Sequence, residues 1–298
     1  MCKSNFFLNN KKIISSSVLN YYTLTKNILI GIAFSPNLKA NIFETIRLSN
    51  MFGAQLIGVH VGQKTDEKEK QLHELLKEAP ELKFPLKVIW QEGKPVDVIL
   101  KTTKQENVDL LILGALQKEK LYKYYVGSIA RELTRKAPCS VFLLIKPSTE
   151  RIPCKHIVVS GLQDHKTEET IKAAFNLSKN LGCKRVTIVE EISQAELNVK
   201  VNDDISLRKS TDLKEQMQKR EDERVNKMLQ CIDTNDISVK TQSIFGRRGY
   251  SIGHYAKVKR ADILVMSAPK KTGIMDRIFP HDLEYILAEL PTDVLIVK

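Results

Sequence analysis

Short apolar runs and amphipathic segments alternate along the chain from residue 27 onward. In the first half, short runs rich in Val, Ile and Leu predict β-strands near 27–33, 55–61, 84–91, 108–113 and 140–146. Between them, apolar residues at helical spacing predict helices near 37–52, 66–80, 95–105 and 127–136. Strands that are apolar throughout and alternate with helices are typical of a parallel sheet covered on both faces.

The whole pattern occurs twice. The segment that begins at Asn27 aligns without a gap with the segment that begins at His156, at an offset of 129 residues, and a later pair of segments aligns at an offset of 153. The second half therefore carries about 24 extra residues, near 190–236. A charged stretch within this insertion has helical spacing of its apolar residues, which are Leu213, Met217, Val225 and Met228.

The repeat predicts two tandem α/β domains. Each is expected to be a doubly wound, five-stranded parallel sheet with strand order 3-2-1-4-5 and helices on both faces. We expect residues 1–26 to be an N-terminal extension, 27–149 the first domain and 153–298 the second. A polar segment with two prolines separates the domains. In such folds ligands bind at the carboxyl ends of the strands.

Composition narrows the class of protein. The chain has 298 residues, of which 42% are apolar and 28% are charged, as expected of a soluble globular protein. No apolar run approaches the roughly 20 residues of a membrane helix, and Asn and Lys interrupt the N-terminal apolar residues, so neither a membrane span nor a signal peptide is expected. Five cysteines without a CxxC pair predict no disulfide framework and no zinc site, and we place the protein in the cytoplasm. Cys139 is interpreted as a core residue.

The formal net charge is +12, and most of the excess lies in the first half. Such a charge can attract nucleotides, nucleic acid or an anionic membrane surface, or can be a solvated lysine-rich surface. The chain lacks an RNA-binding aromatic motif, zinc-finger spacing and a basic stripe that alternates with aromatic residues. We therefore do not expect nucleic acid as a partner.

One loop has the features of an anion site. It begins at Gly114, after an apolar strand, and ends at Gly127 and Ser128, where a helix starts. Glycines allow the backbone to approach phosphate oxygens, and the free N–H groups of a helix N-terminus favour an anion. The alternative for Ser128 is a helix N-cap. Positive charge near the loop comes from Lys118, Lys120, Lys123 and Arg131.

These segments resemble a known family. The stretch "NILIGIAFSPN" and the stretch from "VDLLILGA" to "VGSIARELTRKAPCSVFLL" look like the opening and the close of a universal stress protein domain, present here as two tandem domains. ATP-binding members of that family carry G-x-x-G, nine residues and then G-[ST]. Gly114, Gly127 and Ser128 keep three of the four motif positions, and Gln117 replaces the second glycine.

The resemblance implies a nucleotide site in the first domain, for ATP or AMP with Mg²⁺. Its residues would be Gly31, Val61, Leu113, Gly114, Gly127, Ser128 and Ile129; the alternative for each is a core or turn role. Two departures weaken the site. Ala33 stands where binding members have an aspartate, and Gln117 would need φ > 0, which costs about 1–2 kcal/mol.

The second domain departs further from the motif. Leu162 stands at the aspartate position, Ser267–Lys270 replaces the first pair of glycines, and Pro280 and His281 replace Gly-Ser. Because proline has no N–H to offer a phosphate, we expect this domain to bind no nucleotide.

No catalytic residue and no metal site is predicted, because the chain has no nucleophile elbow, no paired carboxylates at a defined spacing and no Walker motif. Three hypotheses remain: a stress-response or signalling module that acts through protein contacts, with at most weak nucleotide binding; a genuine ATP-binding member with ATP-dependent regulation; and an enzyme or nucleic-acid binder. The resemblance also implies that the last strands of the two domains pair as an internal pseudo-dimer, with a homodimer and an unknown protein partner as further possibilities.

Overall fold

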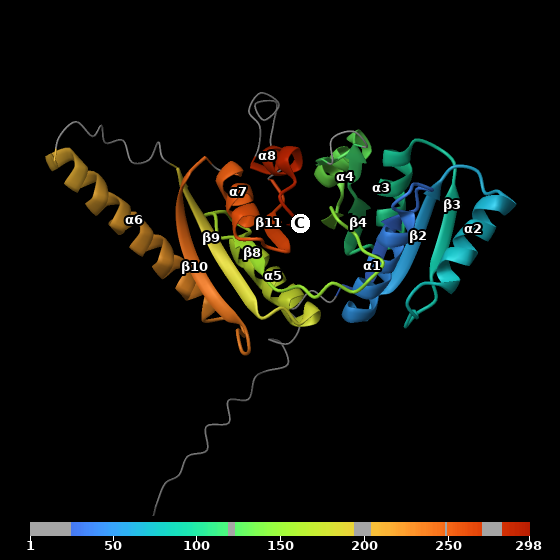
Figure 1. Ribbon diagram of the computed structural model, residues 1–298, viewed down its shortest axis with the longest axis horizontal. Coiled ribbons are helices and arrows are strands. Elements are labelled where there is room, and N and C mark those ends of the chain that lie inside the picture. The colour runs from blue at the N-terminus through green and yellow to red at the C-terminus, as the bar shows by residue number, and fades with distance from the viewer. Residues whose placement is uncertain (1–24, 119–122, 194–203, 248, 270–281) are drawn as a thin grey trace, which may run out of the picture.

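The computed structural model describes residues 25–118, 123–193, 204–247, 249–269 and 282–298 (Figure 1). The first half has five strands in its main sheet: β1 (Asn27–Gly31), β2 (Gln55–Val61), β3 (Lys87–Gln91), β4 (Leu110–Gly114) and β7 (Ser140–Leu144). Its helices are α1 (Leu38–Phe52), α2 (Asp66–Lys77), α3 (Pro95–Gln105) and α4 (Ser128–Lys136). These elements lie where the hydrophobic pattern predicts them.

The second half repeats this order. Its strands are β8 (Ile157–Ser160), β9 (Arg185–Ser193), β10 (Ser238–Gly246), β11 (Ile263–Ser267) and β12 (Asp293–Val297). Its helices are α5 (Thr167–Leu181), α6 (Asp204–Leu229), α7 (Tyr250–Val258) and α8 (Asp282–Glu289). The helix predicted within the insertion is α6, with 26 residues against 12 in its counterpart α2.

All ten of these strands form one continuous sheet, in the order β10-β9-β8-β11-β12-β7-β4-β1-β2-β3. Within each half the order is the predicted 3-2-1-4-5, and every neighbouring pair inside a half is parallel. The halves join where β7 and β12 pair antiparallel, with Leu143 opposite Val294 and Val141 opposite Ile296. The predicted pairing of the last strands is therefore present within the chain. It covers two apolar edges that would otherwise be exposed.

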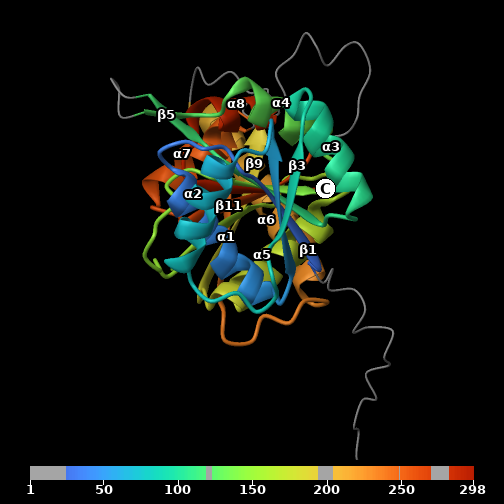
Figure 2. The same ribbon diagram turned by 90° about the vertical axis from the view of Figure 1, so that its right-hand side faces the viewer.

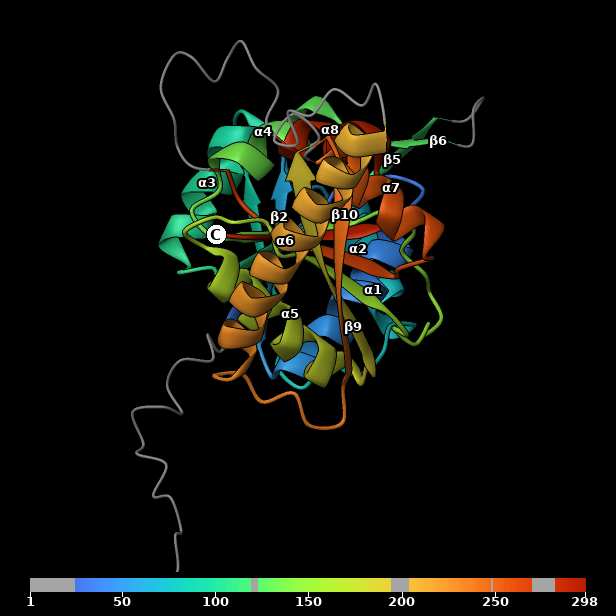
Figure 3. The same ribbon diagram turned by 90° about the vertical axis from the view of Figure 1, so that its left-hand side faces the viewer.

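Helices cover both faces of the sheet. Helices α3, α4, α7 and α8 cover one face, and α1, α2, α5 and α6 cover the other (Figure 1). Each face buries its own apolar cluster, and both clusters continue across the β7–β12 junction. Figure 2 views this arrangement from the first half, and Figure 3 views it from the second half, where α6 crosses in front of β10. None of the described helices is long and apolar enough to cross a membrane.

Equivalent residues form the same turns and hydrogen bonds in the two halves. Helices α1 and α5 end at Gly53 and Gly182, whose φ values of 64° and 70° lie in the left-handed region that favours glycine. The hydroxyl of Ser49 donates to the carbonyl of Ala54 at 2.8 Å, and that of Ser178 donates to the carbonyl of Cys183 at 2.7 Å. The repeat in the sequence is thus a repeat of specific hydrogen bonds.

Two aspartates anchor the starts of the central strands. Asp109 Oδ2 accepts from the backbone N–H groups of Lys26 and Asn27, at 2.8 and 3.1 Å. Asp262 Oδ2 accepts from Lys155 and His156 in the same way, at 2.7 and 2.8 Å. Asp109 thus holds the start of β1 against the loop that precedes β4, and Asp262 holds the start of β8 against the loop that precedes β11.

Candidate functional site

A cavity of about 750 Å³ lies at the carboxyl ends of β1, β2 and β4 in the first half. All seven residues that the sequence proposes for a nucleotide site line it: Gly31, Val61, Leu113, Gly114, Gly127, Ser128 and Ile129. They come from three strands and from the start of α4, so only the folded sheet brings them together. Their chemical role stays a prediction.

The start of α4 lines the cavity with Gly127, Ser128 and Ile129. The N-cap is Gly127, which has no side chain to cap the first backbone N–H groups of the helix. The N-cap alternative for Ser128 is therefore wrong: Ser128 is the first helical residue, and it is exposed on the cavity lining. A Cβ at position 127 would lie 3.0 Å from the side chain of Leu116, so the glycine also permits close packing of the loop. Unsatisfied N–H groups at a helix N-terminus favour an anion.

Asn41 is a site residue that the sequence reasoning missed. It projects from α1 against Gly114, so closely that a Cβ there would lie 2.6 Å from its amide nitrogen. Its Oδ1 is buried and has no hydrogen-bond partner among the described residues, although Asn41 lines the cavity. A buried acceptor without a partner costs free energy unless a ligand or water supplies a donor. The need for glycine at 114 was a usable signal, but the sequence could not reveal its neighbour.

An aromatic cluster supports the wall of the cavity. The His60 ring lies between Phe34 and Trp90, with ring centroids 5.1 and 5.0 Å away, and both His60 and Phe34 line the cavity. His60 Nδ1 lies 2.8 Å from the carbonyl oxygen of Ile32, which requires a proton on Nδ1, and Nε2 lies 3.3 Å from Lys68 Nζ. Both ring nitrogens have hydrogen-bond partners, so the contacts of His60 give it a structural role in the wall of the cavity.

The loop between Gly114 and Gly127 differs from the expectation. Leu116–Lys118 and Lys123–Tyr125 form a two-stranded antiparallel hairpin, β5 and β6, in which Gln117 pairs with Tyr124. The expected strain at Gln117 is not found, because a strand position needs no left-handed backbone. Lys120 lies outside the described residues, as do the side chains of Lys118 and Lys123.

Arg131 does not contribute charge to the cavity as expected. Its Nη1 lies 2.8 Å from Glu284 Oε2 on α8, and Arg135 Nη2 lies 2.6 Å from the other oxygen of the same carboxylate. This ion-pair group joins the two halves and leaves Arg131 engaged away from the site.

The lining of the cavity is uncharged. No Asp, Glu, Lys or Arg lies among the described residues that form it, and Ala33 occupies the position of the family's aspartate. The described residues hold no cluster of His, Cys, Asp and Glu that would suit a metal ion. Mg²⁺ prefers carboxylate, phosphate and water oxygens, so any Mg²⁺ at this site would have to be held by phosphates.

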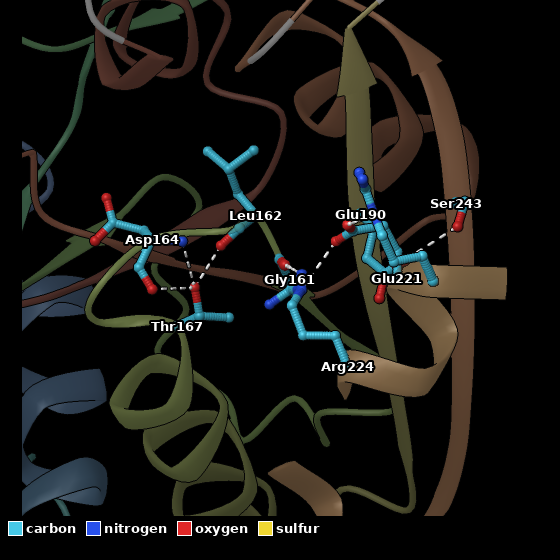
Figure 4. Close-up of polar contacts among 9 residues, drawn as sticks. Gly161, Leu162, Asp164, Thr167, Glu190, Glu221, Arg224 and Ser243 are labelled. Atoms are coloured by element: carbon cyan, nitrogen blue, oxygen red, sulfur yellow. Dashed lines mark hydrogen bonds and ion pairs between the residues drawn. The ribbon is translucent and has the colours of Figure 1, made fainter. Parts of the chain in front are cut away.

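The same edge of the second half is built differently (Figure 4). Leu162 stands where the first half has Ala33, and Glu190 on β9 stands where it has Val61. Arg224 on α6 donates to the carbonyl of Gly161 and pairs with Glu221 at 2.9 Å. The inserted helix therefore contributes side chains to this edge. Lys270, Pro280 and His281, which replace the motif, lie outside the described residues.

Glu190 is a buried carboxyl group at this edge. It is 1% exposed; Oε2 accepts a hydrogen bond from Ser243 at 3.1 Å, and Oε1 has no partner among the described residues. Burial raises the pKa of Glu190 from its ordinary value to about 7, against the opposing effects of the Ser243 hydrogen bond and the charge of Arg224. The first half has no carboxyl at the equivalent position.

Cys139 is buried at the start of β7, and burial raises the pKa of its thiol to about 11. The interpretation of Cys139 as a core residue is thus confirmed.

The sequence model of the universal stress protein family matches residues 62–144 and 157–298. The chain belongs to the universal stress protein family. It is 31% identical over 67 residues to a universal stress protein of Methanothermobacter thermautotrophicus. The aligned segment covers 22% of this chain and 44% of that protein. It is 26% identical over 129 residues to a universal stress protein E homolog of Haemophilus influenzae. The aligned segment covers 41% of this chain and 41% of that protein. The matched segments thus span less than half the length of these two relatives.

The fold has a solved counterpart of the same extent. A universal stress protein from Archaeoglobus fulgidus superposes with a TM-score of 0.61 and 17% identity, over 92% of this chain and 98% of that one. At this identity the likeness concerns the fold alone. The tandem arrangement with helices on both faces is therefore an architecture found in the family.

Proposed function

We propose that this tandem universal stress protein is a non-catalytic, cytoplasmic regulatory module that acts through protein contacts. Its first half binds a nucleotide such as ATP or AMP weakly, and its second half binds none. The observation that carries the proposal is the cavity of about 750 Å³ at the start of α4, which gathers all seven expected residues. A regulatory role requires a ligand site whose occupancy can alter contacts with a partner, and it does not require a catalytic residue.

The cavity suits the nucleoside and one phosphate. Apolar side chains of Val61, Leu113 and Ile129 can cover a base and ribose. The open N-terminus of α4 at Gly127 and Ser128 can receive an anion, and the unpartnered Oδ1 of Asn41 can accept from a ligand hydroxyl or amino group.

The affinity of the first half for a nucleotide should be low, because the described lining offers no charges that complement those of the nucleotide. Among the described residues the lining has no carboxylate for the ribose and no cation for the phosphates, and the β5–β6 hairpin replaces the glycine-rich loop. We expect a dissociation constant on the order of 10–1,000 μM, which corresponds to roughly 4–7 kcal/mol.

Glu190 argues against a nucleotide in the second half. A carboxyl with a pKa near 7, buried where the first half offers Val61, is partly ionised at neutral pH and would repel a phosphate. The Arg224 and Glu221 side chains of α6 contact the same edge. This half is therefore assigned to protein contacts or to stabilising the first.

The surface available to a partner follows from the sheet. Because β7 and β12 pair with each other inside the chain, a homodimer or a protein partner must use another surface. The outermost strands β3 and β10 and the long helix α6 remain for that purpose.

Calorimetric titration of MgATP and of AMP tests the proposal. Gly127→Asp adds a negative charge at the start of α4. Since φ at 127 is −61°, an ordinary residue fits the backbone there, and the added Cβ meets only the half-exposed side chain of Leu116, which can move aside. Asn235→Asp adds the same charge on an exposed turn of the second half and is the matched control. Wild type and control should bind within the stated range, and Gly127→Asp should bind at least about tenfold more weakly.

Three outcomes would contradict parts of this assignment. Submicromolar binding would favour the genuine ATP-binding alternative. Equal binding by Gly127→Asp and the wild type would place the site elsewhere. Absence of binding at millimolar nucleotide would leave protein contacts as the function of both halves.

A further inference from the structure

Two cysteines meet at the amino edge of the sheet in the second half. Cys154 precedes β8, and Cys183 precedes β9, with which β8 pairs in parallel. In that pairing Ile157 lies opposite Val186, so the same register continued back by three residues places Cys154 opposite Cys183. Adjacent strands lie about 4.8 Å apart, within the Cα separation of roughly 4.4–6.8 Å that a disulfide bridges.

The two side chains are in contact. The thiols of Cys154 and Cys183 hydrogen-bond to each other, which lowers the pKa of Cys183 and raises that of Cys154. Cys183 Sγ also lies 3.5 Å from the carbonyl oxygen of Arg185, and Ser178 hydrogen-bonds to the thiol. Among the neighbouring charges, Asp262 opposes ionisation of both thiols. The lowered pKa favours ionisation of one thiol of the pair, and the thiolate is the reactive form.

The first half shows that the fold does not require this pair. At the repeat offset of 129 residues, Cys154 and Cys183 correspond to Thr25 and Ala54. Yet the serine hydrogen bond of the turn is the same, 2.8 Å at Ala54 and 2.7 Å at Cys183. Packing alone is thus satisfied by alanine, and the thiols are an addition of the second half.

The pair is reachable from outside. Cys154 is half-buried and lines a cavity of about 730 Å³ between the halves, beside Arg151, Ile152 and Pro153 of the linker. Cys183 is 1% exposed and is not among the residues that line this cavity. A small oxidant can therefore enter from the cavity, whereas a large thiol reagent meets Cys154 first.

We propose that Cys154 and Cys183 form a reversible disulfide when the protein meets a hydroperoxide. With hydrogen peroxide, one thiolate of the pair attacks a peroxide oxygen, the O–O bond breaks, and the leaving hydroxide takes a proton to become water; an organic hydroperoxide releases an alcohol in the same step. The second thiolate then attacks the resulting sulfenic acid, the S–S bond forms, and a second water leaves. With hydrogen peroxide, two thiols and one peroxide give one disulfide and two waters.

The disulfide would tie the end of the interdomain linker to the junction of α5 and β9. It closes a loop of about 30 residues that contains β8 and α5, and such a crosslink stabilises mainly by restricting the unfolded chain. We expect the oxidised protein to unfold about 5 °C higher than the reduced protein. The redox state of the linker would then set how firmly it is held against the second half.

Peptide mapping of the full chain tests the pair directly. Reduced protein is exposed to hydrogen peroxide, its remaining thiols are alkylated, and it is digested with trypsin under denaturing, non-reducing conditions. The peptides IPCK (152–155) and NLGCK (180–184) should appear as one crosslinked species, which dithiothreitol separates. The variants Cys154→Ser and Cys183→Ser should each lose this species and the thermal shift. Cys231→Ser, which removes the exposed cysteine at the end of α6, should keep both.

Specific results would overturn the proposal. They are alkylation of both peptides after peroxide treatment, oxidation of either cysteine to the sulfinic acid without a crosslink, or a crosslink that involves Cys231. Circular dichroism of the reduced serine variants checks that they fold. If a variant does not fold, the wild type alone still decides, because its crosslinked peptide is either present or absent.

Discussion

The two halves share their backbone anchors at the amino edge of the sheet and differ in the side chains that line the carboxyl edge. At the amino edge, Asp109 and Asp262 accept the same pair of backbone N–H groups, and Gly53 and Gly182 end equivalent helices with the same left-handed turn. At the carboxyl edge the first half has an uncharged cavity, and the second half has Glu190 with side chains of α6. The shared anchors serve the fold. The positions that differ, at the carboxyl edge and at the Cys154–Cys183 pair, are where function can change without loss of the fold.

The junction between the halves should give the largest effect. Leu143 and Ile296 are each 1% exposed on the paired strands β7 and β12. Changing both to Lys places two charges in the core, and we expect the free energy of unfolding to fall by at least about 5 kcal/mol. Urea unfolding and limited proteolysis would measure this loss and show whether the halves come apart.

The matched control for the junction changes two exposed apolar residues, Ile152 and Val258, to Lys. These substitutions should alter stability by less than about 1 kcal/mol in total. An unchanged stability in the Leu143 and Ile296 double variant would mean that the contact between the halves lies elsewhere.

Removal of the equivalent aspartates tests the likeness of the amino edges. Asp109→Ala and Asp262→Ala each leave two strand N–H groups without their acceptor, so each should cost about 2–3 kcal/mol of unfolding free energy. The corresponding Asn variants keep an acceptor and should cost less. Chemical denaturation measures all four, and a difference above about 1 kcal/mol between the two Ala variants would contradict equivalence.

Glu190 tests the difference between the carboxyl edges through pH. Its folded pKa, about 7, lies above its ordinary value, so the folded protein retains a proton that the unfolded chain releases. The stability of the wild type should therefore fall as pH rises from about 4.5 to 7. Glu190→Gln removes the contribution of Glu190 to this fall and leaves that of Asp293, whose pKa burial also raises, to about 6. The variant should be more stable than the wild type by about 2 kcal/mol at pH 8, with little difference at pH 4.

The control for this experiment is Glu223→Gln, on an exposed position of α6. The free energy of unfolding is measured at several pH values between 4 and 8. Its slope against pH should match the wild type in Glu223→Gln and should be flatter in Glu190→Gln. If the stability of Glu190→Gln fell with pH as steeply as that of the wild type, the pKa of Glu190 in the folded protein would not be raised.

The smallest effect is expected at the ion pair that bridges α4 and α8. Arg135 contacts Glu284 at 2.6 Å, but its side chain is 53% exposed, so Arg135→Ala should cost only about 0.5 kcal/mol. The cost should vanish in 1 M salt, which screens exposed charges. A loss above about 2 kcal/mol at high salt would make this bridge, rather than β7 and β12, the main contact between the halves.

The sequence by itself determined the architecture. The hydrophobic pattern placed the strands and helices, the offset repeat fixed two equivalent halves, and the apolar last strands implied their pairing, because these signals depend on local periodicity and on burial. It also selected seven residues that meet in one cavity, through the resemblance to a family whose site lies on strand ends.

Only the tertiary structure decided what surrounds those residues. Asn41 approaches Gly114 from another helix, Arg131 pairs with Glu284 from the other half, and Cys154 meets Cys183 through strand register. The β5–β6 hairpin arises from pairing that relieves Gln117 of the expected backbone strain. Each of these contacts joins residues distant in the chain, and their partners are set by how the layers pack, which local sequence patterns do not encode.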